Sequence, residues 1–179
     1  RVAAAIRSER GMSEQVAPTL VERIEEVAAR YPNRRSAILP ALHLAQEHYG
    51  WLPPEAFEAV AEALETTPAF CQSVASFYDM FHLRPVGKHM IEVCTNVACA
   101  LNGAGDVLKE FQEQLGIGPG ETTADGMYTL RTVECLGGCG TAPTVAVNHR
   151  FREFFERSQV KPLLTELKAR LDIATVEGN

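Results

Sequence analysis

The first half of the chain repeats apolar residues at steps of three and four positions, which is the spacing of one face of an amphipathic helix. Prolines, glycines and helix-capping residues interrupt this repeat, and each interruption predicts the end of one helix and the start of the next. The pattern therefore predicts a small bundle of short helices that ends near His82. The helices are expected from Ser13 to about Tyr31, from an N-cap at Ser36 to Tyr49 with Gly50 as C-cap, from Pro53 and Pro54 through Leu64, and from a cap at Thr67 through Phe77.

The second half of the chain changes period. Apolar and polar residues alternate before Cys94, as in a strand, and helical repeats return further on. The order strand, helix, strand, hairpin, helix is typical of a thioredoxin-like α/β fold, so the whole chain is expected to be of the α+β class. The strands are expected from His89 to Cys94, from Gly126 to Val133, and as a hairpin from Thr144 to Val147 and from Phe151 to Phe154 that turns at Asn148, His149 and Arg150; the helices are expected from Ala104 to Leu115, closed by Gly116, and along Val160, Leu163, Leu164, Leu167 and Leu171.

These elements divide the chain into four predicted parts. They are an N-terminal arm at residues 1–12, a helical bundle at 13–86, a thioredoxin-like domain at 87–173 and a C-terminal tail at 174–179.

Cysteine is the residue type that carries the chemistry of this chain. Four of the five cysteines form two close pairs, Cys94 with Cys99 and Cys135 with Cys139, and 35 residues separate the pairs. Each pair follows a predicted strand. Because the ends of neighbouring strands lie at one edge of a sheet, the two loops are expected to face each other, and four thiolates in one place predict a metal centre.

Composition limits the other classes of function. The chain has 179 residues, a formal net charge of −6 and no Lys/Arg cluster, which disfavours a nucleic-acid surface. No apolar run approaches the roughly 20 residues that span a bilayer, so direct membrane insertion is not expected. The N-terminal residues lack the apolar core of a secretory signal, so we expect a reducing compartment, where cysteines serve metal or redox chemistry rather than disulfides.

The remaining cysteine, Cys71, lies at helical spacing with apolar neighbours and is interpreted as a buried core residue without a ligand role. The apolar stripe expected for its helix is Phe70, Val74 and Phe77. Aromatic residues of this half have two open interpretations, as core of the bundle or as a surface for a partner. They are Trp51, Phe77, Tyr78 and Phe81.

Ligand spacing alone leaves zinc and an iron–sulfur cluster open, since both take four thiolates. Iron and sulfide are favoured because glycines around Cys139 allow backbone N–H groups to approach sulfur atoms. No Lys or Arg lies beside any of the paired cysteines, and an apolar core of this size does not need a zinc staple. A dithiol redox site uses C-x-x-C at a helix N-terminus, and neither pair has that spacing.

Several separated segments resemble the thioredoxin-like [2Fe–2S] subunit of the NADH dehydrogenase module of respiratory complex I. The most specific is ECLGGC at 134–139, followed by Ala142 and Pro143. The others lie at 50–53, 75–78, 80–81, 93–94 with Cys99, 120–123 and 125–126, so the resemblance covers about residues 15–172.

This resemblance implies that Cys94, Cys99, Cys135 and Cys139 ligate one [2Fe–2S] cluster, while Cys71 matches no ligand of the family. The implied role is that of a one-electron carrier in NADH:quinone oxidoreductase, with no catalytic residues in this chain. The implied partners are a subunit that binds NADH and FMN, and further iron–sulfur subunits. NADH and FMN are expected only in that partner, because this chain has no Rossmann fingerprint or phosphate loop.

The implied location is a peripheral arm on the cytoplasmic side of the inner membrane, or the mitochondrial matrix in a eukaryote. The same type of subunit serves NAD-linked hydrogenases and formate dehydrogenases, and the motif does not separate these from complex I. From a different class, a zinc-stapled interaction module without a redox role stays open at this point.

Overall fold

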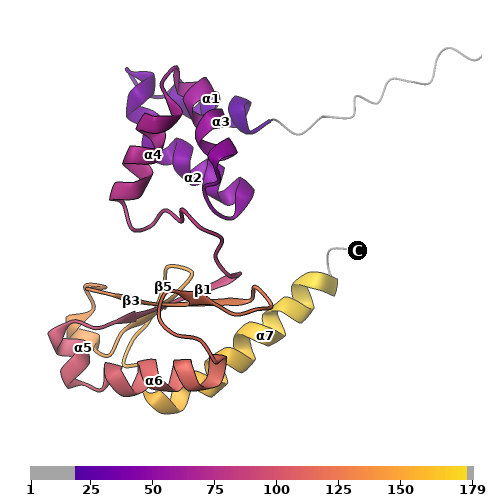
Figure 1. The fold of residues 1–179 in the computed structure, drawn as a ribbon. Helices are drawn as coiled ribbons and strands as arrows, with labels where there is room; N and C mark the ends of the chain where they lie inside the picture. The colour runs from indigo at the N-terminus through magenta and orange to yellow at the C-terminus, as the bar shows by residue number, and fades with distance from the viewer. Residues whose placement is uncertain (1–18, 177–179) are drawn as a thin grey trace, which may run out of the picture. The chain divides into compact units, whose positions relative to one another are not determined.

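The computed structural model describes residues 19–176, so the predicted N-terminal arm at 1–12 lies outside the described residues. The chain forms two compact units that divide between Arg84 and Pro85. The first unit is helical, and the second combines a sheet with helices (Figure 1). The sequence pattern places the corresponding boundary between residues 86 and 87.

The first helix, α1, spans Leu20–Ala28 and begins at a capping box. The Glu22 N–H donates to the Thr19 hydroxyl at 3.3 Å, and the Thr19 N–H donates to the Glu22 carboxylate at 2.7 Å. This reciprocal pair satisfies two backbone donors and holds Thr19 in an extended conformation, so the helix begins at Leu20. A continuous helix from Ser13 is therefore wrong, while residues 13–18 themselves lie outside the described part.

The second helix, α2, spans Ile38–Tyr49, and a 3₁₀ turn, η1 (Arg34–Ala37), leads into it. The prediction that Ser36 caps α2 is wrong, because Ser36 lies inside η1 and Asn33 caps that turn with its side chain. The C-terminal prediction is confirmed, since Gly50 adopts a left-handed φ of +79° after the last helical residue.

The third helix, α3 (Pro54–Leu64), is the centre of the bundle and packs against α1, α2 and α4 (Pro68–Phe77). Its predicted apolar stripe is confirmed as core: Phe57, Val60, Ala61 and Leu64 are all buried.

The predicted cap of α4 is confirmed, because the Thr67 hydroxyl accepts a hydrogen bond from a backbone N–H of the first turn. The predicted stripe of this helix is right only in part. Val74 is half-buried and packs against the core, but the fully buried residues are Cys71 and Ala75, and Phe77 is 81% exposed. Small side chains on this face let α4 lie close to α3. The core interpretation of Cys71 is confirmed, and Phe81 is buried in the same core.

The second unit contains a five-stranded sheet in the order β2-β3-β1-β4-β5. The central strand β1 runs parallel to β3 and antiparallel to β4. Helices α5, α6 and α7 lie along one face of the sheet (Figure 1). The strands are β1 (His89–Cys94), β2 (Glu121–Thr122), β3 (Tyr128–Val133), β4 (Val145–Val147) and β5 (Arg150–Arg152), and the helices are α5 (Val97–Leu101), α6 (Ala104–Leu115) and α7 (Val160–Val176).

Alternate residues of the strands supply one side of the core, and the two longer helices supply the other. The sheet contributes Ile91, Val93 and Leu130, which are fully buried. They pack in one cluster with Val107 and Phe111 of α6 and with Val160, Leu163 and Leu167 of α7. The predicted β1 and α6 are confirmed with their bounds, including Gly116 as the C-cap of α6.

Turn chemistry shortens two of the predicted strands. The strand β3 begins at Tyr128 rather than Gly126, because Gly126 has a φ of +68° and closes a turn that connects β2, which the pattern did not predict. The predicted hairpin is confirmed, but it turns on two residues, Asn148 and His149, both with positive φ, so β5 begins at Arg150 rather than Phe151. It ends at Arg152 and does not reach Phe154, whose φ is +48°.

The helix α5 was not predicted, and α7 continues to Val176, past the predicted domain end at residue 173. The rest of the predicted tail, 177–179, lies outside the described residues. No helix in residues 19–176 is both long enough and apolar enough to cross a membrane.

Candidate metal centre

Two neighbouring parallel strands bring both cysteine pairs to the same end of the sheet. Cys94 is the last residue of β1 and stands in register with Val133, the last residue of β3. Cys135 follows two positions later, at the start of the loop that leads to Cys139. Because parallel strands end at the same edge, the loops after β1 and β3 leave the sheet side by side, as the strand pattern predicts.

The two pairs differ in burial. Cys94 and Cys99, here called the inner pair, are each 2% exposed, and Cys99 is held on the inward side of α5. Cys135 and Cys139, the outer pair, are exposed. The outer loop, 135–139, contains Gly137 in a left-handed conformation, and the Gly137 N–H donates to Cys135 Sγ at 3.3 Å.

Hydrogen bonds hold the two loops together. Asn96, the N-cap residue of α5, donates through Nδ2 to the carbonyl of Glu134 at 2.9 Å. The neighbouring Thr95 N–H donates to the carbonyl of Val133 at 3.0 Å. On the other side, Thr144 Oγ1 donates to the carbonyl of Gly138 at 3.2 Å. The relative position of the inner and outer pairs is therefore set by the protein itself.

The inner pair has an environment suited to a thiolate. Burial works to raise the pKa of the Cys94 thiol, but backbone N–H groups of Asn96 and Leu136 and the thiol of Cys99 donate to its sulfur, and together they lower that pKa. Burial and the neighbouring Cys94 raise the pKa of Cys99, against hydrogen bonds from Thr144 that lower it. The Leu136 N–H comes from the outer loop, so the outer loop helps to stabilise a thiolate of the inner pair.

The donor set fits a binuclear cluster. A [2Fe–2S] cluster spreads four thiolates over two irons and uses N–H groups directed at sulfur. Two cysteine pairs at one sheet edge, with backbone N–H groups at Cys94 and Cys135, provide these features.

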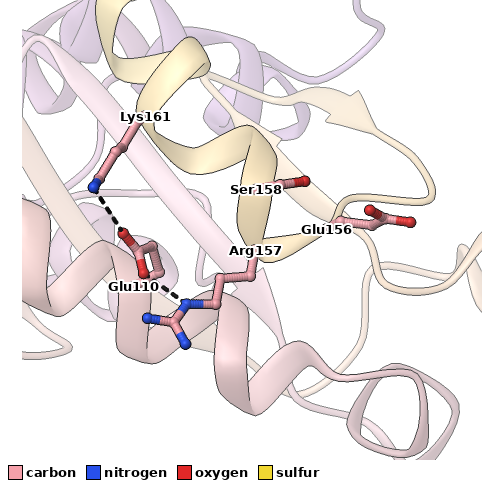
Figure 2. A pocket seen from close by; sticks show the side chains of 5 residues that line it. All are labelled: Glu110, Glu156, Arg157, Ser158 and Lys161. Carbon is pink, nitrogen blue, oxygen red and sulfur yellow. Dashed lines mark hydrogen bonds and ion pairs between the residues drawn. The ribbon is translucent and has the colours of Figure 1, made fainter.

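An open hollow lies elsewhere in this unit, and no cysteine lines it. It measures about 480 Å³ and is lined by Glu110 of α6, by Glu156, Arg157 and Ser158 of the turn before α7, and by Lys161 of α7 (Figure 2). In it, Arg157 Nε donates to Glu110 Oε2 at 2.7 Å, and Lys161 Nζ lies 4.0 Å from Glu110 Oε1. The hydrogen bond from Arg157 lowers the pKa of Glu110. These charges neutralise one another, so the cluster joins α6 to α7 rather than forming a ligand site.

Sequence reasoning missed two supporting residues. Asn96 had a local signal, because asparagine is a preferred N-cap and a helix follows it, but that helix was not predicted. Thr144 had no local sequence signal, because its contact with Gly138 depends on how the loop after β3 folds back.

Comparison with known proteins gives the family. The thioredoxin-like [2Fe–2S] ferredoxin family matches residues 24–168. The chain belongs to this family. The cofactor of thioredoxin-like [2Fe–2S] ferredoxins is a [2Fe–2S] cluster, which confirms the sequence-based cofactor prediction and sets aside the zinc and dithiol alternatives.

Two relatives match nearly the whole chain, and both are named as subunits of NADH-quinone oxidoreductase. The relative from Rhizobium meliloti (strain 1021) is 42% identical over 159 residues, which cover 89% of this chain and 95% of that protein. The relative from Thermus thermophilus is 41% identical over 157 residues, which cover 86% of this chain and 87% of that protein.

A solved structure has the same fold. It is an NAD⁺-reducing [NiFe]-hydrogenase in the air-oxidised state, with a TM-score of 0.67 and 24% identity over 74% of this chain. This ferredoxin chain corresponds to only 23% of that hydrogenase chain, and at this identity the likeness concerns the fold alone. The predicted fold class, a helical N-terminal part followed by a thioredoxin-like domain, is confirmed.

Proposed function

We propose that the chain is the electron-carrying subunit of an NADH:quinone oxidoreductase, and that Cys94, Cys99, Cys135 and Cys139 bind its [2Fe–2S] cluster. The ligand assignment rests on one observation, that β1 and β3 are adjacent and parallel and release both cysteine pairs at one edge of the sheet. The choice of complex is supported by relatives at 42% and 41% identity that are named as subunits of NADH-quinone oxidoreductase.

When bound, the cluster supplies a centre that takes up and gives back one electron. The residues of this chain hold it in place and set its surroundings. The inner pair would hold one side from a buried position beside α5, and the outer pair would hold the other side from an exposed loop. Backbone N–H groups that donate to Cys94 and Cys135 stabilise negative charge on sulfur, which favours the reduced state.

The partner in this proposal is the subunit of the same complex that binds NADH and FMN, with further iron–sulfur subunits beyond it in an arm on the cytoplasmic side of the membrane. The glycine-rich segment at 116–121 supports the view that this chain binds no nucleotide. It follows the helix α6 rather than a strand, and Gly116 serves as a helix cap.

Substitution of the outer pair tests the ligand assignment. Cys135→Ser and Cys139→Ser should each abolish the visible absorption and the paramagnetic signal of the cluster in protein reconstituted with iron and sulfide, because serine does not replace a soft thiolate. Iron and acid-labile sulfide are measured in parallel with the unaltered chain. A normal signal in either variant would show that the assignment is wrong, and stoichiometric zinc in colourless native protein would overturn the electron-transfer function.

Isolation of the complex tests the choice of oxidoreductase. The full chain, tagged and expressed in its own cells, should co-purify with an activity that reduces quinone with NADH. Recovery of hydrogen- or formate-dependent NAD⁺ reduction instead would assign the chain to a hydrogenase or a formate dehydrogenase.

A further inference from the structure

A buried ion pair joins the two strands that carry the cysteine loops. Glu92 of β1 stands in register with Arg131 of β3. Arg131 Nε donates to Glu92 Oε1 at 2.8 Å, and Arg131 Nη2 donates to the same oxygen. The side chain of Glu92 is 5% exposed and that of Arg131 is 24% exposed. The two charges are therefore held within the sheet rather than at its surface.

Stability of the fold alone does not account for charges at this place. Glu92 lies on the sheet face opposite to Ile91 and Val93, and its register partner on β4 is Ala146, which is fully buried. The free energy needed to remove two charges from water often exceeds their mutual attraction, and apolar residues of similar size often serve folding as well. Glutamate is also depleted in strands. The pair in the central strand therefore indicates a role besides folding.

The ion pair lies close to both cysteine loops. Glu92 precedes Cys94 by two residues in β1, which corresponds to about 7 Å between their Cα atoms in an extended strand. Arg131 precedes Val133, the register partner of Cys94, by the same step. Arg131 is the only Lys or Arg in β1 and β3, and neither cysteine loop contains one. Arg131 is therefore the one fixed positive charge that these two strands and their loops contribute beside the cysteine pairs.

We propose that Arg131 and Glu92 together set how readily the metal centre accepts an electron. The inference rests on the ligand assignment of the proposed function. An added electron places one more negative charge on a centre whose four thiolates are already negative. Salt screens buried charges only weakly, so both side chains act on that added charge. Arg131 favours the reduced state, and Glu92 holds the guanidinium in place and offsets its charge.

The test is a redox titration at pH 8 of the full chain loaded with iron and sulfide, followed by visible absorption and paramagnetic resonance. At a fixed ambient potential, Glu92→Gln should raise the ratio of reduced to oxidised cluster about tenfold, or about 59 mV for one electron. Arg131→Gln should lower this ratio by a similar factor. A unit charge has an effect of this size over about 12 Å at an effective dielectric constant of about 20. The double variant, in which both charges are removed, should return to within about twofold of the unaltered chain.

Urea unfolding separates this role from a structural one. Each single variant leaves a buried charge without its partner, so both should unfold at a lower urea concentration than the unaltered chain. A structural role changes both variants in the same direction, whereas the electrostatic role changes the ratio of reduced to oxidised cluster in opposite directions. The matched control is Lys88→Gln, which removes the same charge as Arg131→Gln. Lys88 is exposed directly before β1, about 20 Å from Cys94 along an extended strand, so salt screens its charge and the ratio should stay within about twofold.

Unchanged ratios in both single variants, or changes in the same direction, would overturn the role of the ion pair and leave the ligand assignment intact. A change by Lys88→Gln as large as that by Arg131→Gln would also overturn it, because the effect would then follow net charge alone. If one single variant takes up no cluster, the other should still differ about tenfold from the double variant, and equal ratios in those two would overturn the role. Absence of iron and sulfide from the reconstituted unaltered chain would overturn the ligand assignment and this inference together.

Discussion

Cys71 in the helical unit and Cys94 in the α/β unit are buried to the same extent but have opposite chemistry. They are 0% and 2% exposed, respectively. Cys71 lies among apolar side chains of the bundle, and burial raises the pKa of its thiol to about 11. At Cys94 burial works in the same direction, yet donors from Asn96, Leu136 and Cys99 lower the pKa.

This difference shows that burial does not distinguish a core cysteine from a metal ligand. Between Cys71 and Cys94 the difference lies in the donors around the sulfur, because hydrogen bonds to a buried sulfur favour its thiolate form. A thiolate is the form that binds metal. The donors to Cys94 come from α5 and its N-cap and from the loop after β3.

Replacing each cysteine with alanine should give the largest contrast. Cys94→Ala should eliminate the cluster, while Cys71→Ala should keep full cluster content and lose about 1 kcal/mol of folding free energy, from the small cavity left in the bundle. Iron and sulfide analysis with paramagnetic resonance measures the first effect, and denaturant unfolding measures the second. Equal cluster content in the two variants would contradict the assignment of Cys94 as a ligand and of Cys71 as a core residue.

Breaking the bond between the cysteine loops should give the next largest effect. In Asn96→Asp, the carboxylate keeps the cap of α5 but presents an acceptor to the Glu134 carbonyl, where Asn96 Nδ2 donates at 2.9 Å. A lost bond of this kind is worth about 1–3 kcal/mol, so release of iron to a chelator should be about 5- to 150-fold faster.

The control for this variant is Asn102→Asp, which introduces the same charge after α5. Asn102 Nδ2 donates only to the Ala98 carbonyl, at 2.7 Å, within one loop. Identical rates of iron release from the two variants would show that the bond between the loops does not hold the cysteine pairs.

Substitution with alanine should have different effects at Gly138, in the outer loop, and at Gly140, in the turn after it. A Cβ at Gly138 would lie 2.6 Å from Thr144 Oγ1, and Thr144 is fully buried, so Gly138→Ala should cost about 1–2 kcal/mol and alter the paramagnetic spectrum. A Cβ at Gly140 meets nothing within 4 Å, so Gly140→Ala should leave stability and spectrum nearly unchanged. Thermal unfolding and the spectrum of the reduced protein check both, and equal effects would refute the role of Thr144.

The smallest expected effect is a pH dependence of the unfolding free energy that is caused by the Cys71 thiol. Its folded pKa is raised from near 9 to about 11, so folding favours the neutral thiol. The stability that Cys71 adds in this way is fully present below the pKa of its thiol in the unfolded chain. It is lost as the pH rises through the pKa of the thiol in the folded chain. At pH 10 the bundle should have lost about 1 kcal/mol of unfolding free energy through this group. Urea unfolding of the unaltered chain and of Cys71→Ala at pH 8 and 10 isolates this effect. An identical loss of unfolding free energy in both proteins would exclude Cys71 as the cause.

The sequence by itself determined the elements that depend on local rules. Gly50 and Gly116 end helices because glycine accepts a left-handed φ, and alternating apolar residues predicted β1 with its observed bounds. The cysteine spacing after two strands was enough to place both pairs at one edge, because parallel neighbouring strands end together.

Only the tertiary structure decided which contacts surround those elements. Periodicity placed Cys71 in the core of α4 but also included Phe77, which is exposed, and only the packing against α3 showed that Ala75 completes the buried face. The bond from Asn96 to Glu134 and the contact of Thr144 with Gly138 join residues 38 and 6 positions apart. Their partners are set by how strands pair and loops fold back, and no local propensity carries that information.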